Sequence, residues 1–277
     1  MRGVVMRRPK LGQHFLRDPK VIETILQAAE LSPTDTALEI GPGKGVLTEP
    51  LLGRVRSLVA VELDRTLGPK LDARFNGRTG WALIPNDILK VDLTALFPEA
   101  SPDHPIKILG NLPYSITSPI FEKILAWPGW NTGVFLVQRE VGDRMRSGPG
   151  SKTFGVLSLA VQLFAEVEAI AVVKPGAFVP PPRVTSLVIR LRRRRTLALP
   201  AADLPAFFDL VHAAFSHRRK TLANSLSLFA DLPKKNVEAW LAMQGVRATA
   251  RAETLELTEY VRLAAAWAIF RRETNLT

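Results

Sequence analysis

The sequence contains no cysteine, which excludes disulfide bonds, thiolate metal sites, iron–sulfur clusters and a cysteine nucleophile. Its four histidines show no HExxH-like spacing, so no metal site is expected. No uninterrupted apolar run reaches the roughly 18 residues needed to span a bilayer. The basic N-terminus is not followed by the apolar run of a secretory signal. These absences predict a cytoplasmic protein that has no membrane partner.

What the chain has in excess is positive charge. Its 277 residues include 37 Lys and Arg against 26 Asp and Glu, which gives a formal net charge of +11. Hydrophobic residues make up 47% of the chain, enough for an ordinary folded core. Such a charge points to a polyanionic partner, most often nucleic acid, although it can also serve solubility alone.

Short apolar runs alternate with helical patterns through the first two thirds of the chain. This alternation predicts right-handed βαβ crossovers and a mostly parallel sheet covered on both faces. Two later strand-like runs flank a proline-rich loop and suit an antiparallel pair at the edge of the sheet. The predicted strands are 36–40, 57–63, 81–84, 106–109, 133–137, 169–173 and 184–191.

Strand signals stop near residue 196, and apolar residues then repeat at helical spacing. An arginine-rich run at 190–195 marks this change. The sequence therefore predicts a doubly wound α/β domain over 1–195, with a basic N-terminal arm, and a small all-helical domain over 196–277.

The turn after the first predicted strand, EIGPGKG at 39–45, is rich in glycine. Glycines such as Gly41 and Gly43 let the backbone approach a ligand closely, although an ordinary tight turn would have them too. The turn lacks the spacing of a Walker P-loop and of the dinucleotide fingerprint. Glu39 places a carboxylate beside it, which disfavours a pyrophosphate and suits a cationic ligand.

Acidic residues also end the next two predicted strands. Glu62 stands about twenty residues after the glycine turn, where a carboxylate can accept both hydroxyls of a ribose. Asp87 is placed to accept from an exocyclic amine such as that of adenine. Each acid alone could be a loop residue or a helix cap. With Glu39, the three describe a nucleoside with a positively charged or zwitterionic tail, which is S-adenosylmethionine.

The fourth predicted strand runs into Asn111-Leu112-Pro113-Tyr114. Methylating the exocyclic amine of a base is difficult because the nitrogen lone pair is delocalised into the ring. The Asn111 side chain and the Leu112 backbone, turned outward by Pro113, offer carbonyl oxygens that can favour a tetrahedral nitrogen. Tyr114 offers a face on which an extruded base can stack. The structural alternative is a Pro-Tyr turn that caps a helix.

Six motifs appear in order along the chain: LGQHFL at 11–16, EIGPGKGVLT at 39–48, VELD at 61–64, NLPY at 111–114, FVPPPRVTS at 178–186 and FSHRRKTLANSL at 215–226. With them the chain resembles the small-subunit ribosomal RNA adenine dimethyltransferases, the KsgA/RsmA family, over nearly its whole length. The early motifs also resemble the erythromycin-resistance methylases of large-subunit rRNA. The last motif is similar to the small-subunit branch.

This resemblance implies a Rossmann-like class I S-adenosylmethionine-dependent methyltransferase domain followed by a small C-terminal helical RNA-binding domain. It implies transfer of four methyl groups to N6 of two adjacent adenines, in the 3′-terminal hairpin of 16S rRNA within the immature 30S subunit. Nothing in it demands more than a monomer. Two alternatives stay open: a large-subunit rRNA adenine methylase, and a non-catalytic ribosome-assembly or transcription factor on the same scaffold.

The resemblance also implies roles for individual residues. Tyr114 and Phe178 would sandwich the target base, although a phenylalanine in a proline-rich loop can also serve only in packing. His14 stands where the family often has Asn, and Asn86 stands where Gly is common. The candidate cofactor-binding residues are His14, Leu16, Glu39, Gly41, Gly43, Glu62, Asp87 and Asn111. The candidate catalytic residues are Asn111, Leu112, Pro113, Tyr114 and Phe178.

Two basic clusters are candidate contacts for the RNA phosphates, unless they are merely solvated faces. The first follows the fifth predicted strand, and the second is expected to start a helix in the C-terminal domain. The arginine run at 190–195 is expected to add to the same basic surface. The candidate RNA-binding residues are Arg139, Arg144, Arg146, Lys152, Arg218, Arg219 and Lys220.

Overall fold

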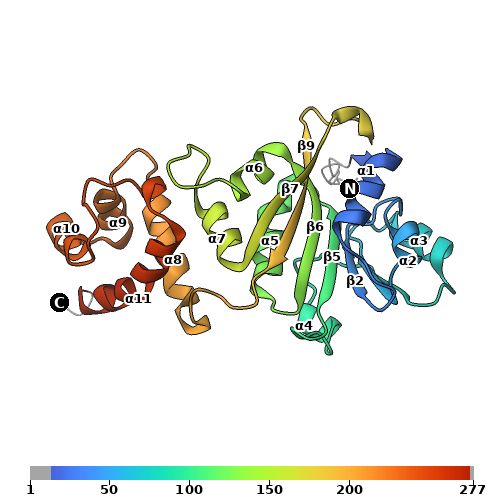
Figure 1. Cartoon of the computed structure of the whole chain (residues 1–277), viewed down its shortest axis with the longest axis horizontal. Helices are drawn as coiled ribbons and strands as arrows, with labels where there is room; N and C mark the ends of the chain where they lie inside the picture. The colour runs from blue at the N-terminus through green and yellow to red at the C-terminus, as the bar shows by residue number, and fades with distance from the viewer. Residues whose placement is uncertain (1–13, 275–277) are drawn as a thin grey trace, which may run out of the picture. The chain divides into compact units, whose positions relative to one another are not determined.

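The computed structural model describes residues 14–274, so the predicted N-terminal arm lies outside the described residues. The chain forms two compact units (Figure 1). The first comprises Met1–Gly142 and Glu168–Arg192, and the second comprises Asp143–Val167 and Arg193–Thr277. This division differs from the predicted boundary after residue 195, because 143–167 groups with the C-terminal helices. Among residues 14–274, no helix is both long enough and apolar enough to cross a membrane.

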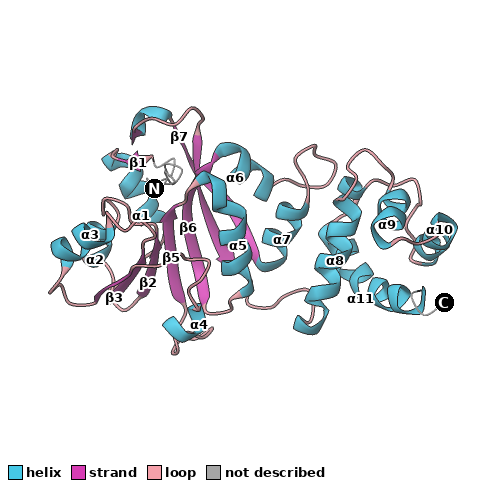
Figure 2. Cartoon of the chain, turned by 180° about the vertical axis from the view of Figure 1, so that it is seen from behind, coloured by secondary structure: helices cyan, strands magenta, loops and turns pink. Residues whose placement is uncertain are grey.

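A seven-stranded sheet forms the centre of the first unit, in the order β4-β3-β2-β5-β6-β9-β7 (Figure 2). The pairs from β4 to β6 are parallel, and β9 runs antiparallel to β6. This confirms the predicted α/β fold with its two late strands at one edge. The strands are β2 (Thr36–Ile40), β3 (Ser57–Val61), β4 (Trp81–Ile84), β5 (Ile106–Asn111), β6 (Trp130–Gln138), β7 (Ala165–Val173) and β9 (Ser186–Arg193).

Helices cover both faces of this sheet, because successive side chains of β6 point to opposite faces and pack against different helices. Phe135 points to one face and packs edge-on against Phe121 of α5, with ring centroids 5.0 Å apart. Its neighbours Val134 and Leu136 point to the other face and join a buried cluster with Ile25 of α1. The helices of this part are α1 (Pro19–Ala28), α2 (Thr48–Leu52), α3 (Gly68–Phe75), α4 (Leu93–Leu96), α5 (Thr117–Ala126) and α6 (Arg139–Met145).

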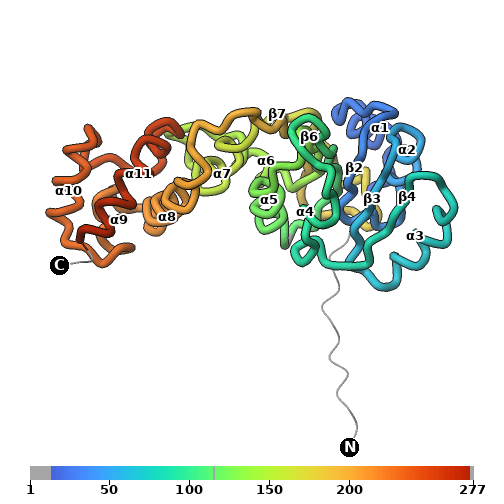
Figure 3. Tube along the Cα trace, turned by 90° about the horizontal axis from the view of Figure 1, so that it is seen from below, coloured from blue at the N-terminus to red at the C-terminus, as the bar shows by residue number. Residues whose placement is uncertain are grey.

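The second unit is helical, and its helices can be followed in Figure 3. Here α8 packs against α9 and α11, and α9 also packs against α10. Because α7 contacts both α8 and α11, the segment that carries it groups with this unit and not with the sheet. The helices are α7 (Val156–Phe164), α8 (Leu204–Phe215), α9 (Leu222–Ala230), α10 (Lys234–Met243) and α11 (Leu257–Thr274).

The basic segment 217–220 lies in the turn between α8 and α9, so the prediction that it starts a helix is wrong. The helix begins one residue after Thr221, whose hydroxyl accepts a hydrogen bond from the Asn224 backbone N–H. Threonine at this position satisfies an otherwise unpaired backbone donor of the first turn. The cap therefore fixes where α9 starts.

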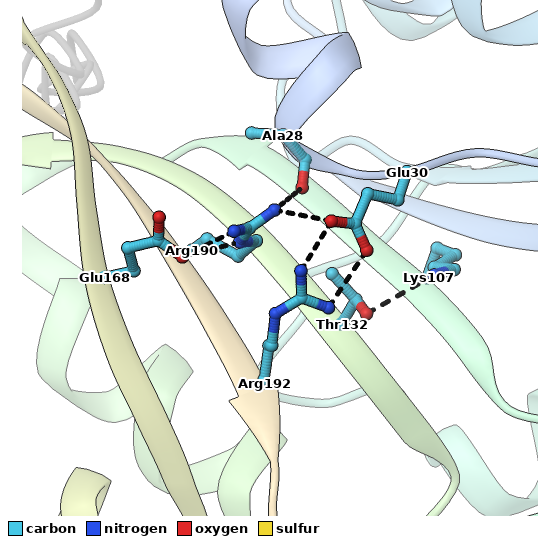
Figure 4. Close-up of polar contacts among 7 residues, drawn as sticks. All are labelled: Ala28, Glu30, Lys107, Thr132, Glu168, Arg190 and Arg192. Atoms are coloured by element: carbon cyan, nitrogen blue, oxygen red, sulfur yellow. Dashed lines mark hydrogen bonds and ion pairs between the residues drawn. The ribbon is translucent and has the colours of Figure 1, made fainter.

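Three of the arginines in the 190–195 run form ion pairs with glutamates, as Figure 4 shows for two of them. Arg190 binds Glu30 at 2.8 Å, Glu168, and the Ala28 carbonyl at the end of α1. Arg192 also binds Glu30, and Arg194 lies 3.2 Å from Glu166. The expectation that this run faces RNA is therefore not supported for these three residues, whose charges are balanced within the protein.

Candidate active site

The strand order places a crevice between two turns of the chain. From β2 the sheet continues through β3 and β4 on one side, whereas β5 pairs with β2 on the other. Ligands of open α/β sheets bind beyond the carboxyl ends of the strands at such a reversal of order. Ile40 pairs with Gly110, so the glycine turn after β2 and the turn after β5 emerge side by side.

A pocket at this point gathers all the predicted cofactor and catalytic residues except Phe178. Five segments that are distant in sequence contribute to it: β1 (Phe15–Leu16) and the turns after β2, β3, β4 and β5. The lining includes His14, Leu16, Glu39, Gly41, Gly43, Glu62, Asp87, Asn111, Leu112, Pro113 and Tyr114.

The glycine turn needs its glycines for two different reasons. Gly41 and Gly43 have φ angles of +67° and +60°, which other residues rarely adopt. No described atom lies within 4 Å of the position where a Cβ of Gly41 would stand, so this side of the turn is open to a ligand. A Cβ on Gly43 would instead lie 3.2 Å from the Phe15 ring, which packs closely on the turn.

Two buried carboxyl groups lie in this pocket on neighbouring strands. Glu39 is 1% exposed, and its Oε2 accepts a hydrogen bond of 2.7 Å from the Thr48 hydroxyl. Burial raises the pKa of Glu39 to about 8, and the nearby Glu62 carboxyl adds to this effect. Burial also raises the pKa of Glu62, opposed by backbone N–H groups of Asp64 and Gly43 at 2.8 and 3.0 Å. The pocket thus favours a positively charged ligand.

The third predicted acid, Asp87, is positioned by its own loop. Its Oδ1 accepts a hydrogen bond of 3.0 Å from the Leu89 backbone N–H, and the residue lines the pocket. Leu63 and Ile88 supply apolar walls beside the two acids, and the sequence analysis did not single them out. The available signal was their position, since each directly follows an acidic residue at a strand end.

The turn after β5 holds two candidate acceptor oxygens. The Asn111 Nδ2 donates a hydrogen bond of 2.9 Å to the His14 carbonyl, which fixes the amide with Oδ1 on the opposite side. The Pro113 carbonyl accepts from the Thr117 hydroxyl at 3.0 Å. By contrast, the Leu112 carbonyl accepts no hydrogen bond from another described residue. The Asn111 and Leu112 oxygens therefore remain available to a ligand.

The two predicted stacking aromatics are placed differently. Tyr114 lines the pocket, with its hydroxyl 2.7 Å from Ser186 Oγ and its ring 5.9 Å from that of His14. Phe178, in the two-residue strand β8 (Phe178–Val179), pairs with Leu16 and is only 2% exposed within the core. The structure therefore does not bring Phe178 to the pocket, because the residue is buried in the core cluster that also contains Leu16.

All seven candidate RNA-binding residues are exposed. Arg139 belongs to the first unit, and the other six belong to the second. There the Arg218 guanidinium donates a hydrogen bond to the Lys152 carbonyl. This contact joins two basic clusters that lie 66 residues apart in the sequence.

Comparison with known proteins supports the chemistry indicated by the pocket. A family model described as "Ribosomal RNA adenine dimethylase" matches residues 5–268. The chain belongs to this family. Membership confirms the predicted enzyme class, an rRNA adenine dimethyltransferase with S-adenosylmethionine as its methyl donor. It also confirms the resemblance found in the motifs.

Individual relatives cover nearly the whole chain. A "Ribosomal RNA small subunit methyltransferase A" of Lachnoclostridium phytofermentans is 42% identical over 259 residues, which cover 92% of this chain and 89% of the relative. A protein of the same description from Xylella fastidiosa is 44% identical over 255 residues, covering 91% and 93% of the two chains.

Two solved structures of methyl-transferring enzymes share the fold. A dimethyladenosine transferase from Plasmodium falciparum has a TM-score of 0.76 at 23% identity, covering 93% of this chain and 98% of its own. The 23S rRNA methyltransferase ErmE has a TM-score of 0.67 at 30% identity, covering 92% and 99%. The Rossmann-like methyltransferase fold with a C-terminal helical region is thereby confirmed.

Proposed function

We propose that this protein transfers four methyl groups to N6 of two adjacent adenines in the 3′-terminal hairpin of 16S rRNA, within the immature 30S subunit. The observation that carries the proposal is the meeting of the acid-lined pocket with the Asn111–Tyr114 turn at one point of the sheet. Relatives named for the small subunit are 38–44% identical, whereas the ErmE structure, named for 23S rRNA, is 30% identical. This difference favours the small-subunit substrate.

The pocket residues fit S-adenosylmethionine, which supplies an electrophilic methyl group on a positively charged sulfur. Glu39 and Glu62 are buried carboxyls whose hydrogen-bond partners are a hydroxyl and backbone N–H groups, so their charge is free to balance a cation. In our proposal Glu62 holds the ribose and Asp87 holds the adenine amine of the cofactor. The open side of Gly41 admits the cofactor close to the backbone.

On the target side, the Asn111 Oδ1 and the Leu112 carbonyl accept the two N–H bonds of the unmodified adenine amine in the first transfer, and one of them accepts the N–H that is left in the second. These contacts favour a tetrahedral nitrogen, whose lone pair then attacks the methyl carbon. The cofactor would supply the methyl group and keep the electrons of the carbon–sulfur bond on its sulfur, and the adenine nitrogen would lose a proton to water. Tyr114 supplies the stacking face, whereas Phe178 would have to leave the core to complete a sandwich.

The second unit provides the surface for the rest of the RNA. Exposed Arg218, Arg219 and Lys220 lie in one turn, and Lys152 joins them through the contact of its carbonyl with Arg218. Such side chains bind phosphates and orient the substrate without reading its sequence. We propose in addition that the protein acts as a monomer, in the cytoplasm, on maturing subunits.

Methylation of two substrates tests this function. Immature small subunits and protein-free large-subunit rRNA are incubated with the protein and labelled cofactor, and the modified nucleotides are identified by mass spectrometry. We expect N6,N6-dimethyladenine at two neighbouring positions of the small-subunit rRNA. Activity on the large-subunit rRNA alone would overturn the proposed substrate, and a wild-type protein inactive on both would overturn the proposed function.

The role of Asn111 is tested separately. Asn111→Ala removes the Oδ1 acceptor, and we expect methylation to fall by at least about a hundredfold, as for other groups that stabilise a transition state. Binding of RNA should persist, which filter binding can measure. Unchanged methylation would refute the role given to Asn111.

A further inference from the structure

Tyr114 is held at its far end by a residue from another part of the chain. Its hydroxyl lies 2.7 Å from the Ser186 Oγ, and the two residues are 72 positions apart. Ser186 is 0% exposed and stands at the start of β9, opposite Gln138 of β6. The pocket lining does not include Ser186, which places it behind the tyrosine and out of reach of a ligand in the pocket.

This pairing gives a partly exposed ring a fixed support. Tyr114 follows Pro113 in a short 3-10 turn and is partly exposed, so its own turn constrains the ring weakly. Ser186 belongs to a strand whose next residues, Leu187 and Val188, are almost fully buried between neighbouring elements. The hydroxyl is the side-chain atom farthest from the backbone, so rotation about χ1 of Tyr114 would displace it. A hydrogen bond at this atom therefore restricts the torsion that places the ring.

The serine hydroxyl has no other role in this part of the fold. Among the described residues, the Ser186 side chain hydrogen-bonds with Tyr114 and with no other residue. A buried polar atom without a partner is unfavourable, so the two hydroxyls satisfy each other. An alanine would fill nearly the same space without needing a partner. Packing alone therefore does not explain why a hydroxyl is present at this position.

We propose that Ser186 is a positioning residue for the target adenine, holding the Tyr114 ring at its stacking angle before RNA arrives. This inference rests on the proposed function, because it assumes that Tyr114 stacks on the reacting base. A ring that is already oriented loses less conformational freedom when the base stacks on it, and it keeps the amine aligned with the Asn111 and Leu112 oxygens.

A double-mutant cycle tests the proposal. Ser186→Ala and Tyr114→Phe each remove one hydroxyl and keep the aromatic ring. We expect each to lower the methylation rate constant at saturating RNA about fivefold, the usual effect of one neutral hydrogen bond. The double variant should be no slower than either single variant, because both remove the same interaction. Cofactor affinity should not change, since Ser186 lies outside the pocket lining.

A spectroscopic measurement detects the contact without turnover. The chain has two tyrosines, so the protein labelled with 3-fluorotyrosine gives signals from Tyr114 and Tyr260 that Tyr114→Phe assigns. Tyr260 is an internal control, since its hydroxyl donates to the Ala252 carbonyl in the second unit. We expect Ser186→Ala to shift and sharpen the Tyr114 signal as the ring gains freedom, and to leave the Tyr260 signal in place.

Thr132→Val serves as the matched control variant. Thr132 is a buried hydroxyl at the other end of the same strand pair, where it accepts a hydrogen bond from Lys107, and it lies outside the pocket. Its loss should change stability but neither the rate constant nor the Tyr114 signal. A wild-type rate with an unchanged Tyr114 signal in Ser186→Ala would overturn the proposal. So would rate losses that multiply in the double variant. Wild-type inactivity would instead refute the proposed function, and the fluorine signals would still report the contact.

Discussion

The protonation of one buried side chain, Glu39, links this pocket to pH. Its pKa is raised from 4.5 to about 8 in the cofactor-free protein, mainly by burial. Between these values the folded chain binds more protons at this site than the unfolded chain. The stability that the neutral group contributes is therefore complete below pH 4.5 and is lost as the pH rises through about 8.

Glu39→Gln keeps the neutral shape and removes the titration. We expect the melting temperature of the cofactor-free wild type to fall between about pH 6 and about pH 8.5 more steeply than that of the variant. Thermal unfolding followed by circular dichroism across this range measures the difference. Parallel pH profiles for the two proteins would contradict the assignment of a raised pKa to Glu39.

Gly41 offers a second test at the scale of one residue. Gly41→Ala introduces strain at a φ of +67° and places a methyl group on the open side that faces the pocket. We expect cofactor binding to weaken by at least about tenfold, or 1.4 kcal/mol, measured by isothermal titration calorimetry.

Gly77→Ala is the matched control for this change. Gly77 has a φ of +83° and equally no described atom within 4 Å of a Cβ, but it does not line the pocket. Both variants should lose about 1 kcal/mol of stability from the strained backbone. Equal losses of cofactor affinity in both would show that strain, not the pocket, causes the effect.

At the scale of elements, the end of α1 is tied to the sheet by β9. Arg190 has a side chain only 14% exposed and binds Glu30, Glu168 and the Ala28 carbonyl. Since α1 follows β1, which lines the pocket, this attachment supports the cofactor side of the site from the opposite end of the helix.

Arg190→Ala removes the cation bound to Glu168 and one of the two arginines bound to Glu30, and we expect it to reduce the free energy of unfolding by about 2 kcal/mol. Arg54→Ala is the control, because Arg54 and Glu23 form an exposed pair with side chains 39% and 45% accessible. Such pairs contribute less than about 1 kcal/mol. Urea unfolding compares the two variants, and equal losses would contradict the structural role of Arg190.

For the whole molecule, RNA binding depends on where positive charge remains unbalanced. Replacing Arg218, Arg219 and Lys220 together by alanine should reduce the slope of log Kd against log salt by about 0.7–0.9 for each phosphate that the variant no longer binds. Arg194→Ala is the control, because Arg194 is already paired with Glu166. Filter binding at several salt concentrations measures both. A slope unchanged in the triple variant would exclude this turn from the RNA interface.

Most of the order of strands and helices was predictable from the sequence, because the spacing of apolar residues and the positions of turn-forming residues are local properties of the chain. Strands β2 and β4 have the predicted bounds, whereas α4, β1 and β8 span four residues or fewer and leave no periodic signal. The boundary of the second unit was not predictable in this way. Residues 143–167 belong to it through the contacts of α7 with α8 and α11, which are remote in sequence.

The sequence by itself determined the site chemistry, since the glycine turn, three acids at strand ends and Asn111–Tyr114 are consecutive, local motifs that fold into one pocket. Tertiary structure alone decided which side chains are free to act. It buried Phe178 in the core, paired Arg190 and Arg192 with Glu30 and Glu168, and placed Ser186 behind Tyr114. The reason is physical: burial and pairing depend on contacts between distant segments, and local patterns do not record them.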